Sequence, residues 1–86
     1  MKVYVPSSLR SYTGKQNVVQ ADGATLADLL FDLDRRYPGM RFRVIDEQDH
    51  IREHIRIFVN RDVAPNLAAP LKPDDEVRFI MAISGG

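Results

Sequence analysis

One long amphipathic pattern in this sequence limits the folds that are open to it. Between Thr25 and Pro38, leucine and tyrosine recur at helical spacing, at positions 26, 29, 30, 33 and 37. Thr25 is a suitable N-cap, Asp28 places an acid in the first turn, and Pro38-Gly39 ends the helix. Because 86 residues can bury only one core, this helix is expected to cover the rest of the fold.

Four strand-like runs flank the predicted helix, two on each side. Before it, residues 1–5 alternate up to Pro6, which predicts a strand near a sheet edge, and the β-branched run 16–20 predicts the second arm of a hairpin. After it come Ile55–Val59, the strongest strand pattern, and Glu76–Ile80. This order predicts an α+β roll over residues 1–86, with a mixed sheet packed on one main helix.

The remaining stretches are predicted to be turns and loops. Residues 9–14 are expected to form a turn, and residues 42–45 a short helical turn before an exposed polar loop at 46–50. Residues 63–70 are expected to form a loop anchored by Leu67. The predicted domain ends in a flexible tail over residues 81–86, which contains Gly85 and Gly86.

Composition excludes several classes of function. The sequence has no cysteine, so the chain can hold neither a disulfide nor a cysteine-ligated metal, and it performs no thiol catalysis. Twelve basic residues balance twelve acidic ones, which argues against a nucleic-acid partner. No apolar run is long enough for a membrane span, and a cytoplasmic location is expected. His50 and His54 lack a third ligand at useful spacing, so no metal site is expected.

The chain ends in Ser84-Gly85-Gly86 shortly after its last predicted strand. Chain ends are often frayed, and this alone explains many glycine-rich termini. A tail without β-carbons can also enter a narrow slot of a partner enzyme and adopt backbone angles closed to other residues. Gly86 is therefore the candidate reactive position, and Gly85 and Ser84 would give access to it.

Three segments resemble the ubiquitin-like sulfur carriers, a family that includes the small subunit of molybdopterin synthase and the carrier of thiamine biosynthesis. These segments are Phe58-Val59-Asn60-Arg61-Asp62, the run Pro70 to Val77, and Ser84-Gly85-Gly86. The helix start Thr25-Leu26-Ala27-Asp28 is also similar. The resemblance implies a β-grasp (ubiquitin-like) fold and a carrier protein rather than an enzyme.

The resemblance also implies the chemistry of the terminus. A ubiquitin-activating-like adenylyltransferase would use ATP to join the Gly86 carboxylate to AMP, and a sulfur donor protein would then leave a thiocarboxylate there. The carrier itself would bind no cofactor. The expected acceptor is the large subunit of molybdopterin synthase, although residues 37–47 look more like the carriers of cysteine biosynthesis, which would serve a cysteine synthase-like enzyme. A thiamine or other thio-metabolite pathway stays open.

Strand alternation predicts a docking patch on the sheet face away from the helix. Tyr4, Phe58 and Ile80 would point outward there, beside Met81 at the root of the tail. Arg56, Arg61 and Arg78 would either frame this patch or be solvated. Two other functions share the fold: a protein modifier joined to lysines through Gly86, and a β-grasp interaction domain that is never conjugated.

Overall fold

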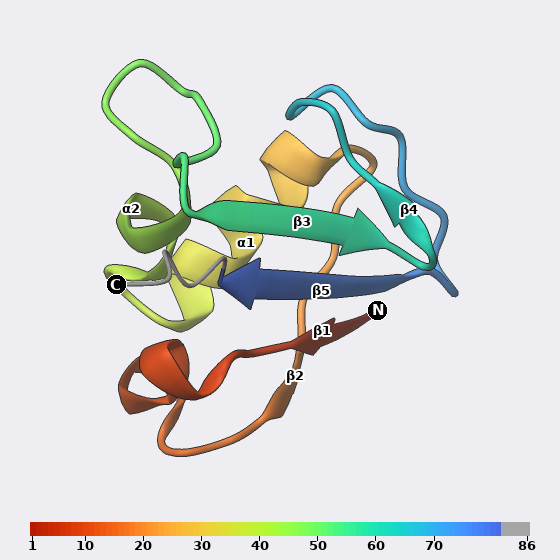
Figure 1. Ribbon diagram of the computed structural model, residues 1–86. Helices are drawn as coiled ribbons and strands as arrows, with labels where there is room; N and C mark the ends of the chain where they lie inside the picture. The colour runs from red at the N-terminus through yellow and green to blue at the C-terminus, as the bar shows by residue number, and fades with distance from the viewer. Residues whose placement is uncertain (82–86) are drawn as a thin grey trace.

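The computed structural model describes residues 1–81, which form a five-stranded sheet with helices on one side (Figure 1). The elements in chain order are β1 (Lys2–Tyr4), the 3-10 helix η1 (Ser7–Thr13), β2 (Val18–Gln20), α1 (Leu26–Arg36), α2 (Met40–Val44), β3 (Ile55–Val59), β4 (Asp62–Val63) and β5 (Glu76–Met81). The predicted main helix and the four predicted strands are all present, each within a few residues of its expected bounds.

The sheet has the order β2-β1-β5-β3-β4. β1 and β2 form the predicted antiparallel hairpin, and β3 is antiparallel to both β4 and β5. β1 and β5 run parallel, so the sheet is mixed, as predicted. β1 lies one strand in from the edge, and β5 is the central strand.

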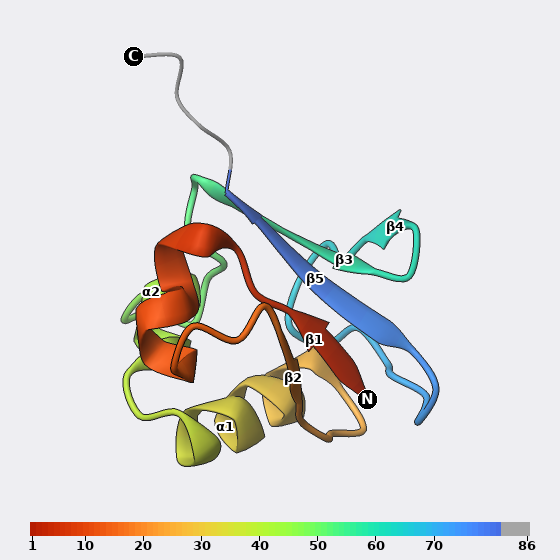
Figure 2. The ribbon, with the colours of Figure 1, turned by 90° about the horizontal axis from the view of Figure 1, so that it is seen from below.

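One apolar core lies between the sheet and the helices (Figure 2). α1 begins where the Thr25 hydroxyl accepts the Asp28 N–H at 3.3 Å, and it ends before Tyr37. The inward side chains of this helix, Leu26, Leu29, Leu30 and Leu33, are all fully buried. From the sheet, Val3, Ile55, Ile57, Val77 and Phe79 meet them, and Val59 is only partly buried. The predicted packing is therefore confirmed, with Val59 at its margin.

The structure corrects one prediction near the N-terminus. The segment expected to be a turn over residues 9–14 is largely the helix η1, which ends at Gly14 in the left-handed region with φ 61°. Only Leu9 and Thr13 are buried within it, so the segment carries too little apolar periodicity to predict a helix.

Two of the segments that carry the family resemblance are bonded to each other. Asn60 lies in the left-handed region with φ 57°, in the turn that ends β3. Its side-chain amide donates to Asp75 Oδ1 at 2.9 Å, and its Oδ1 accepts the Glu76 N–H at 3.0 Å. Asp75 Oδ2 accepts the Lys72 N–H at 2.8 Å. These residues fix the start of β5 beside the end of β3, which gives them a structural role.

We expect Asp75 to make stability depend on pH in the acid range. The hydrogen bond from the Lys72 N–H, followed by that from Asn60, lowers the pKa of Asp75 below its ordinary value of 3.8. Its contribution to stability is therefore complete above that value and is lost as the pH falls through the lowered pKa. Urea unfolding of Asp75→Asn across the acid range should show a weaker loss of stability than the parent protein. Asp74→Asn, at an exposed neighbouring carboxylate, should not.

Candidate functional site

β5 carries the chain to the predicted reactive terminus. It is paired with β1 as far as Arg78 and with β3 as far as Met81, where Ile55 lies opposite. Figure 2 shows β5 running through the sheet to the end of the molecule where η1 and α2 also lie. The predicted reactive and tail-access residues Gly86, Gly85 and Ser84 lie outside the described residues. The described part of the chain therefore fixes the root of the tail.

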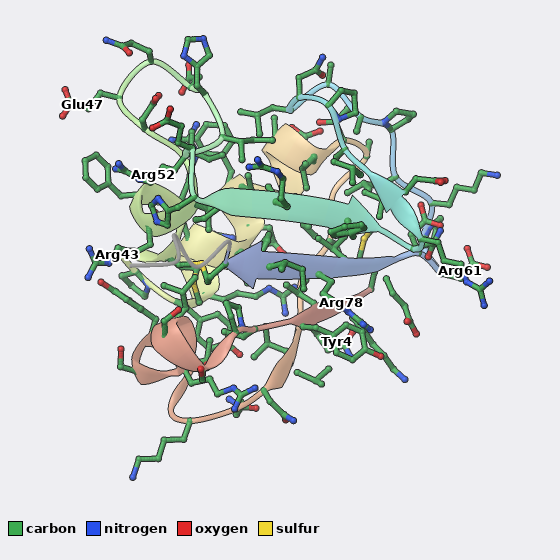
Figure 3. All side chains as sticks on the ribbon, in the orientation of Figure 1. Tyr4, Arg43, Glu47, Arg52, Arg61 and Arg78 are labelled. Carbon is green, nitrogen blue, oxygen red and sulfur yellow. The ribbon has the colours of Figure 1, made fainter. Side chains whose placement is uncertain are left out.

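Three side chains form a row across the uncovered face of the sheet. In register, Arg78 of β5 lies between Tyr4 of β1 and Phe58 of β3. The Arg78 guanidinium carbon lies 4.3 Å from the centre of the Tyr4 ring, and Figure 3 shows the two side chains together in front of the sheet. Tyr4 and Phe58 are both half-buried. The structure thus places these two predicted docking residues on one face of the sheet, with Arg78 between them.

The other two predicted docking residues separate. Ile80 continues the outward row, opposite Arg56 of β3, and 41% of its surface is exposed. Met81 follows it and alternates to the opposite side, where it packs against the core. Both residues nevertheless line the same groove beside the end of β5. We call Tyr4, Phe58, Arg78 and Ile80 the outer face.

Two of the three arginines proposed to frame this patch lie on its side of the sheet, Arg78 and Arg56, which is opposite Ile80. Arg78 belongs to the outer face, and it forms no ion pair with a carboxylate of residues 1–81. The Arg56 guanidinium is held by the carbonyls of Glu53 and Ile55, at 2.9 and 3.2 Å. Arg61 lies in the turn at the far end of the sheet (Figure 3).

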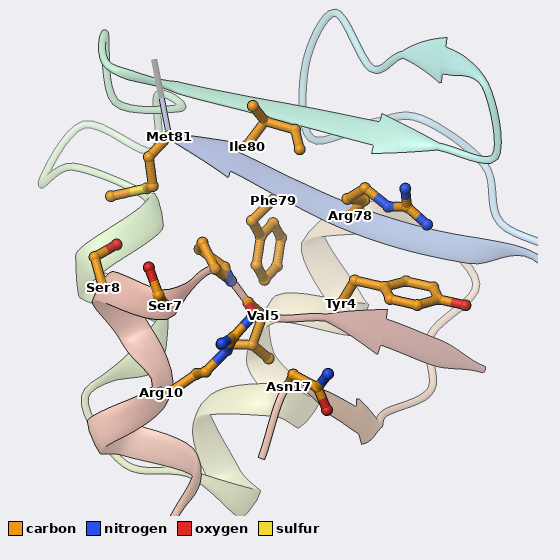
Figure 4. A pocket seen from close by; sticks show the side chains of 11 residues that line it. Tyr4, Val5, Ser7, Ser8, Arg10, Asn17, Arg78, Phe79, Ile80 and Met81 are labelled. Carbon is orange, nitrogen blue, oxygen red and sulfur yellow. The ribbon is translucent and has the colours of Figure 1, made fainter. Parts of the chain in front are cut away.

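A groove of about 650 Å³ runs between η1 and the last residues of β5 (Figure 4). Ile80 and Met81 line one side, Pro6, Ser7 and Ser8 another, and Arg10 and Arg78 contribute its charge. The Arg10 Nε donates to the Val5 carbonyl at 3.1 Å, which holds this side chain across the groove. Arg10 was missed in the sequence because only η1 brings it here, and no motif marks η1.

A smaller hollow lies on the other side of Met81, between η1 and α2. Arg43, Arg52 and His54 line it, together with Phe42 and Ser8, and no carboxylate does. The root of the tail is thus bordered by basic side chains on both sides, although acidic and basic residues balance over the whole chain. This arrangement favours contact with an acidic surface.

The two histidines do not belong to a metal-binding cluster among residues 1–81. His50 pairs only with Asp46, at 4.0 Å, and residues 1–81 contain no group of three side chains able to hold a metal ion. Among the helices in this part of the chain, none has the length and apolar character needed to cross a membrane.

We expect a charge on the outer face to weaken docking without unfolding the protein. Phe58→Glu and Ile80→Glu should each reduce binding to the adenylyltransferase that the family resemblance implies about tenfold or more, because each would place a carboxylate in the predicted docking patch. Isothermal titration calorimetry measures binding and circular dichroism checks the fold. Phe31→Glu is the matched control, since Phe31 is 59% exposed on α1, away from this face. Unfolding of Phe58→Glu would show that this strand face is needed for packing, and unchanged binding would remove the docking patch.

Comparisons with known proteins agree on the family and the fold. The model of the ThiS family matches residues 3–86. The sulfur carrier protein CysO of Mycobacterium tuberculosis is 35% identical, over 98% of this chain and 96% of its own length. A chain of the Amycolatopsis orientalis BexX/CysO complex superposes with a TM-score of 0.91 at 30% identity, covering 99% of this chain and 98% of its own. SAMP1 of Haloferax volcanii gives 0.82 at 25% identity, over 99% and 97%. These neighbours confirm the predicted β-grasp fold.

Proposed function

The chain belongs to the ThiS family of ubiquitin-like sulfur carriers, which are not themselves enzymes, and from this we propose that its Gly86 carboxylate is activated with ATP and converted to a thiocarboxylate. The observation that carries the proposal is the extent of the family match, which reaches residue 86 and so includes Ser84-Gly85-Gly86. The route of β5 supports it, because the central strand ends at Met81, five residues before Gly86.

In the proposed chemistry, the carrier contributes only its terminal carboxylate. A carboxylate is a poor acyl donor, so a ubiquitin-activating-like adenylyltransferase joins Gly86 to AMP and releases pyrophosphate. Hydrosulfide supplied by a donor protein then attacks the carbonyl carbon, a C–S bond replaces the C–O bond to AMP, and AMP leaves, so that a thiocarboxylate remains. Because the chain has no cysteine, no internal thiol competes for the activated acyl group. ATP is bound by the partner, and the carrier needs no cofactor of its own.

Intact mass spectrometry tests this proposal directly. After incubation with the activating enzyme, ATP and a sulfur donor, the mass should rise by about 16 Da, for one oxygen replaced by sulfur. The chain has no thiol to oxidise, but oxidation of one of its three methionines adds the same nominal mass, so the position of the added mass decides the result. Fragmentation should place the added mass on Gly86. Sulfur found elsewhere, or none after pyrophosphate release, would contradict the proposal.

For the acceptor, the relatives favour a pathway other than the first expectation. Molybdopterin was the expected destination, and none of the three relatives compared is named for it. The similarity to CysO, together with residues 37–47, makes a cysteine synthase-like acceptor the better proposal. Transfer of labelled sulfur from the loaded carrier to candidate acceptor enzymes separates the two. We propose that these reactions take place in the cytoplasm.

A protein modifier is the second candidate, and the fold similarity to SAMP1, a small archaeal modifier protein, favours it. It shares the adenylation step and differs in the final nucleophile, a lysine amine. Gly86 found in isopeptide linkage in cell extracts would support this function. A thioacid without conjugates would support the carrier.

A further inference from the structure

β5 loses its neighbour on one side at its last residues. The parallel pairing of β1 with β5 ends at Tyr4 and Arg78. If the same register continued, Pro6 would lie opposite Ile80 and would be the next residue of β1 to hydrogen-bond to β5. The chain instead turns away at Pro6 into η1, and the groove described above opens at this point (Figure 4). A strand that is central along most of its length therefore ends as an edge strand.

The hydrogen-bonding pattern shows which groups of this edge are free. The Asn60 N–H donates to the Glu76 carbonyl, so the backbone groups of Glu76 point toward β3. Backbone groups alternate in direction along a strand, so those of Arg78 and Ile80 also point toward β3. Those of Phe79 and Met81 point the other way, toward β1. A residue at the Pro6 position would donate to the Phe79 carbonyl and accept from the Met81 N–H.

Pro6 can do neither of these things. It has no N–H, and its carbonyl accepts the Leu9 N–H at 2.9 Å. Within residues 1–81, no loop or helix residue bonds to the Phe79 carbonyl or to the Met81 N–H. The Met81 N–H and the Phe79 carbonyl therefore face the groove as one free donor and one free acceptor. Their spacing allows a single residue of a parallel strand to bond to both.

The side chains of the groove select the kind of segment that fits. Ile80, Met81 and Pro6 supply apolar contact. The Arg10 Nε donates to the Val5 carbonyl, and the Arg78 guanidinium stacks on the Tyr4 ring. Among the described residues, no carboxylate pairs with the terminal N–H groups of either guanidinium. Acidic side chains on an incoming strand would pair with them.

We propose that an extended acidic segment of a partner protein binds in this groove as a strand parallel to β5, with one of its residues bonding to the Phe79 carbonyl and the Met81 N–H. Strand addition at an open sheet edge is a common mode of peptide recognition. The bound segment would cover the strand from which the tail leaves. The inference rests on strand register and charge, and it holds whether or not Gly86 carries sulfur.

The test uses the ¹⁵N-labelled full chain and the peptide acetyl-Glu-Val-Glu-Val-Glu-amide, followed by NMR. We expect saturable shifts at the Met81 amide, with its proton moving downfield as the hydrogen bond forms. The amides of Val18 and Gln20, on the open edge of β2, provide the internal comparison and should shift less. The fully N-methylated peptide keeps the side chains but loses every donor, and it should not bind. A peptide with lysine in place of glutamate should bind about fivefold more weakly or worse.

Arginine variants test the charge separately from the backbone edge. Arg78→Gln, and Arg10→Gln with Arg78→Gln, should remove the preference for the acidic peptide over the lysine peptide. Arg78→Gln alone keeps the test valid if the loss of Arg10 disturbs η1. Absence of Met81 shifts at millimolar peptide, equal binding of the two peptides, binding of the N-methylated peptide, or shifts confined to β2 would each overturn the proposal.

Discussion

Deletion of Gly86 is expected to abolish ATP–pyrophosphate exchange with the cognate activating enzyme while leaving thermal stability unchanged. The deletion moves the terminal carboxylate to Gly85, so the tail is one residue shorter and the carboxylate should no longer reach the α-phosphate of ATP in the enzyme. The core that the structure describes within residues 1–81 runs from Val3 to Phe79, and the deletion removes none of its residues. Exchange kinetics and thermal unfolding of the same preparation measure both effects.

Matched variants separate the chemistry of the terminus from its shape. One added residue after Gly86 should block exchange as fully as the deletion, unless it is trimmed. Gly85→Val should impair exchange more than Ser84→Ala, because a β-branched side chain restricts the backbone and widens the chain at the enzyme's slot. Normal exchange by the Gly86 deletion would overturn the carrier function and leave the interaction domain as the better account.

Leu33→Ala is expected to lower the free energy of unfolding by about 2–5 kcal/mol, the range for emptying a buried leucine site. Leu33 has no exposed surface and lies on the face of α1 that packs against the sheet. The free energy of unfolding of a domain of this size is about 5–15 kcal/mol, so the variant should be partly unfolded at moderate urea concentration. Urea denaturation followed by circular dichroism measures the loss.

The same helix supplies the control for this experiment. Phe31→Ala removes a larger side chain two residues away, but Phe31 is 59% exposed and carries Arg41 over its ring at 4.4 Å. Its loss should cost no more than about 1 kcal/mol, as for surface changes in general. Equal destabilisation by the two variants would show that α1 is not held by its leucine face.

The elements that were predicted correctly are those whose buried side chains leave a regular pattern. α1 shows the helical period and β3 the alternation, since each buries most of one face. η1 was not predicted, because a single short helix with two buried residues leaves no period to detect. Asn60 and Asp75 appeared only as part of a resemblance, and their mutual hydrogen bond required the structure.

At the site, alternation along a strand predicts which face of the sheet a side chain is on, but it does not predict which strands lie next to each other. Alternation correctly placed Tyr4, Phe58 and Ile80 on one face, and their docking role stays a prediction. Met81 was grouped with them by proximity in sequence, whereas alternation turns it to the other side. The groove and Arg10 could not be predicted, because both depend on β1 lying beside β5 and leaving it at Pro6.

The pairing of β1 with β5 also determines when the protein can fold during synthesis. These neighbouring strands come from opposite ends of the chain, so the centre of the sheet closes across a loop of about the whole domain, a contact that is slow to form. A nascent chain that has released only β1 to β4 lacks the strand joining β1 to β3. It should therefore stay unfolded and open to proteases and chaperones until β5 emerges. Ribosome-bound chains arrested before and after β5 should differ sharply in protease resistance.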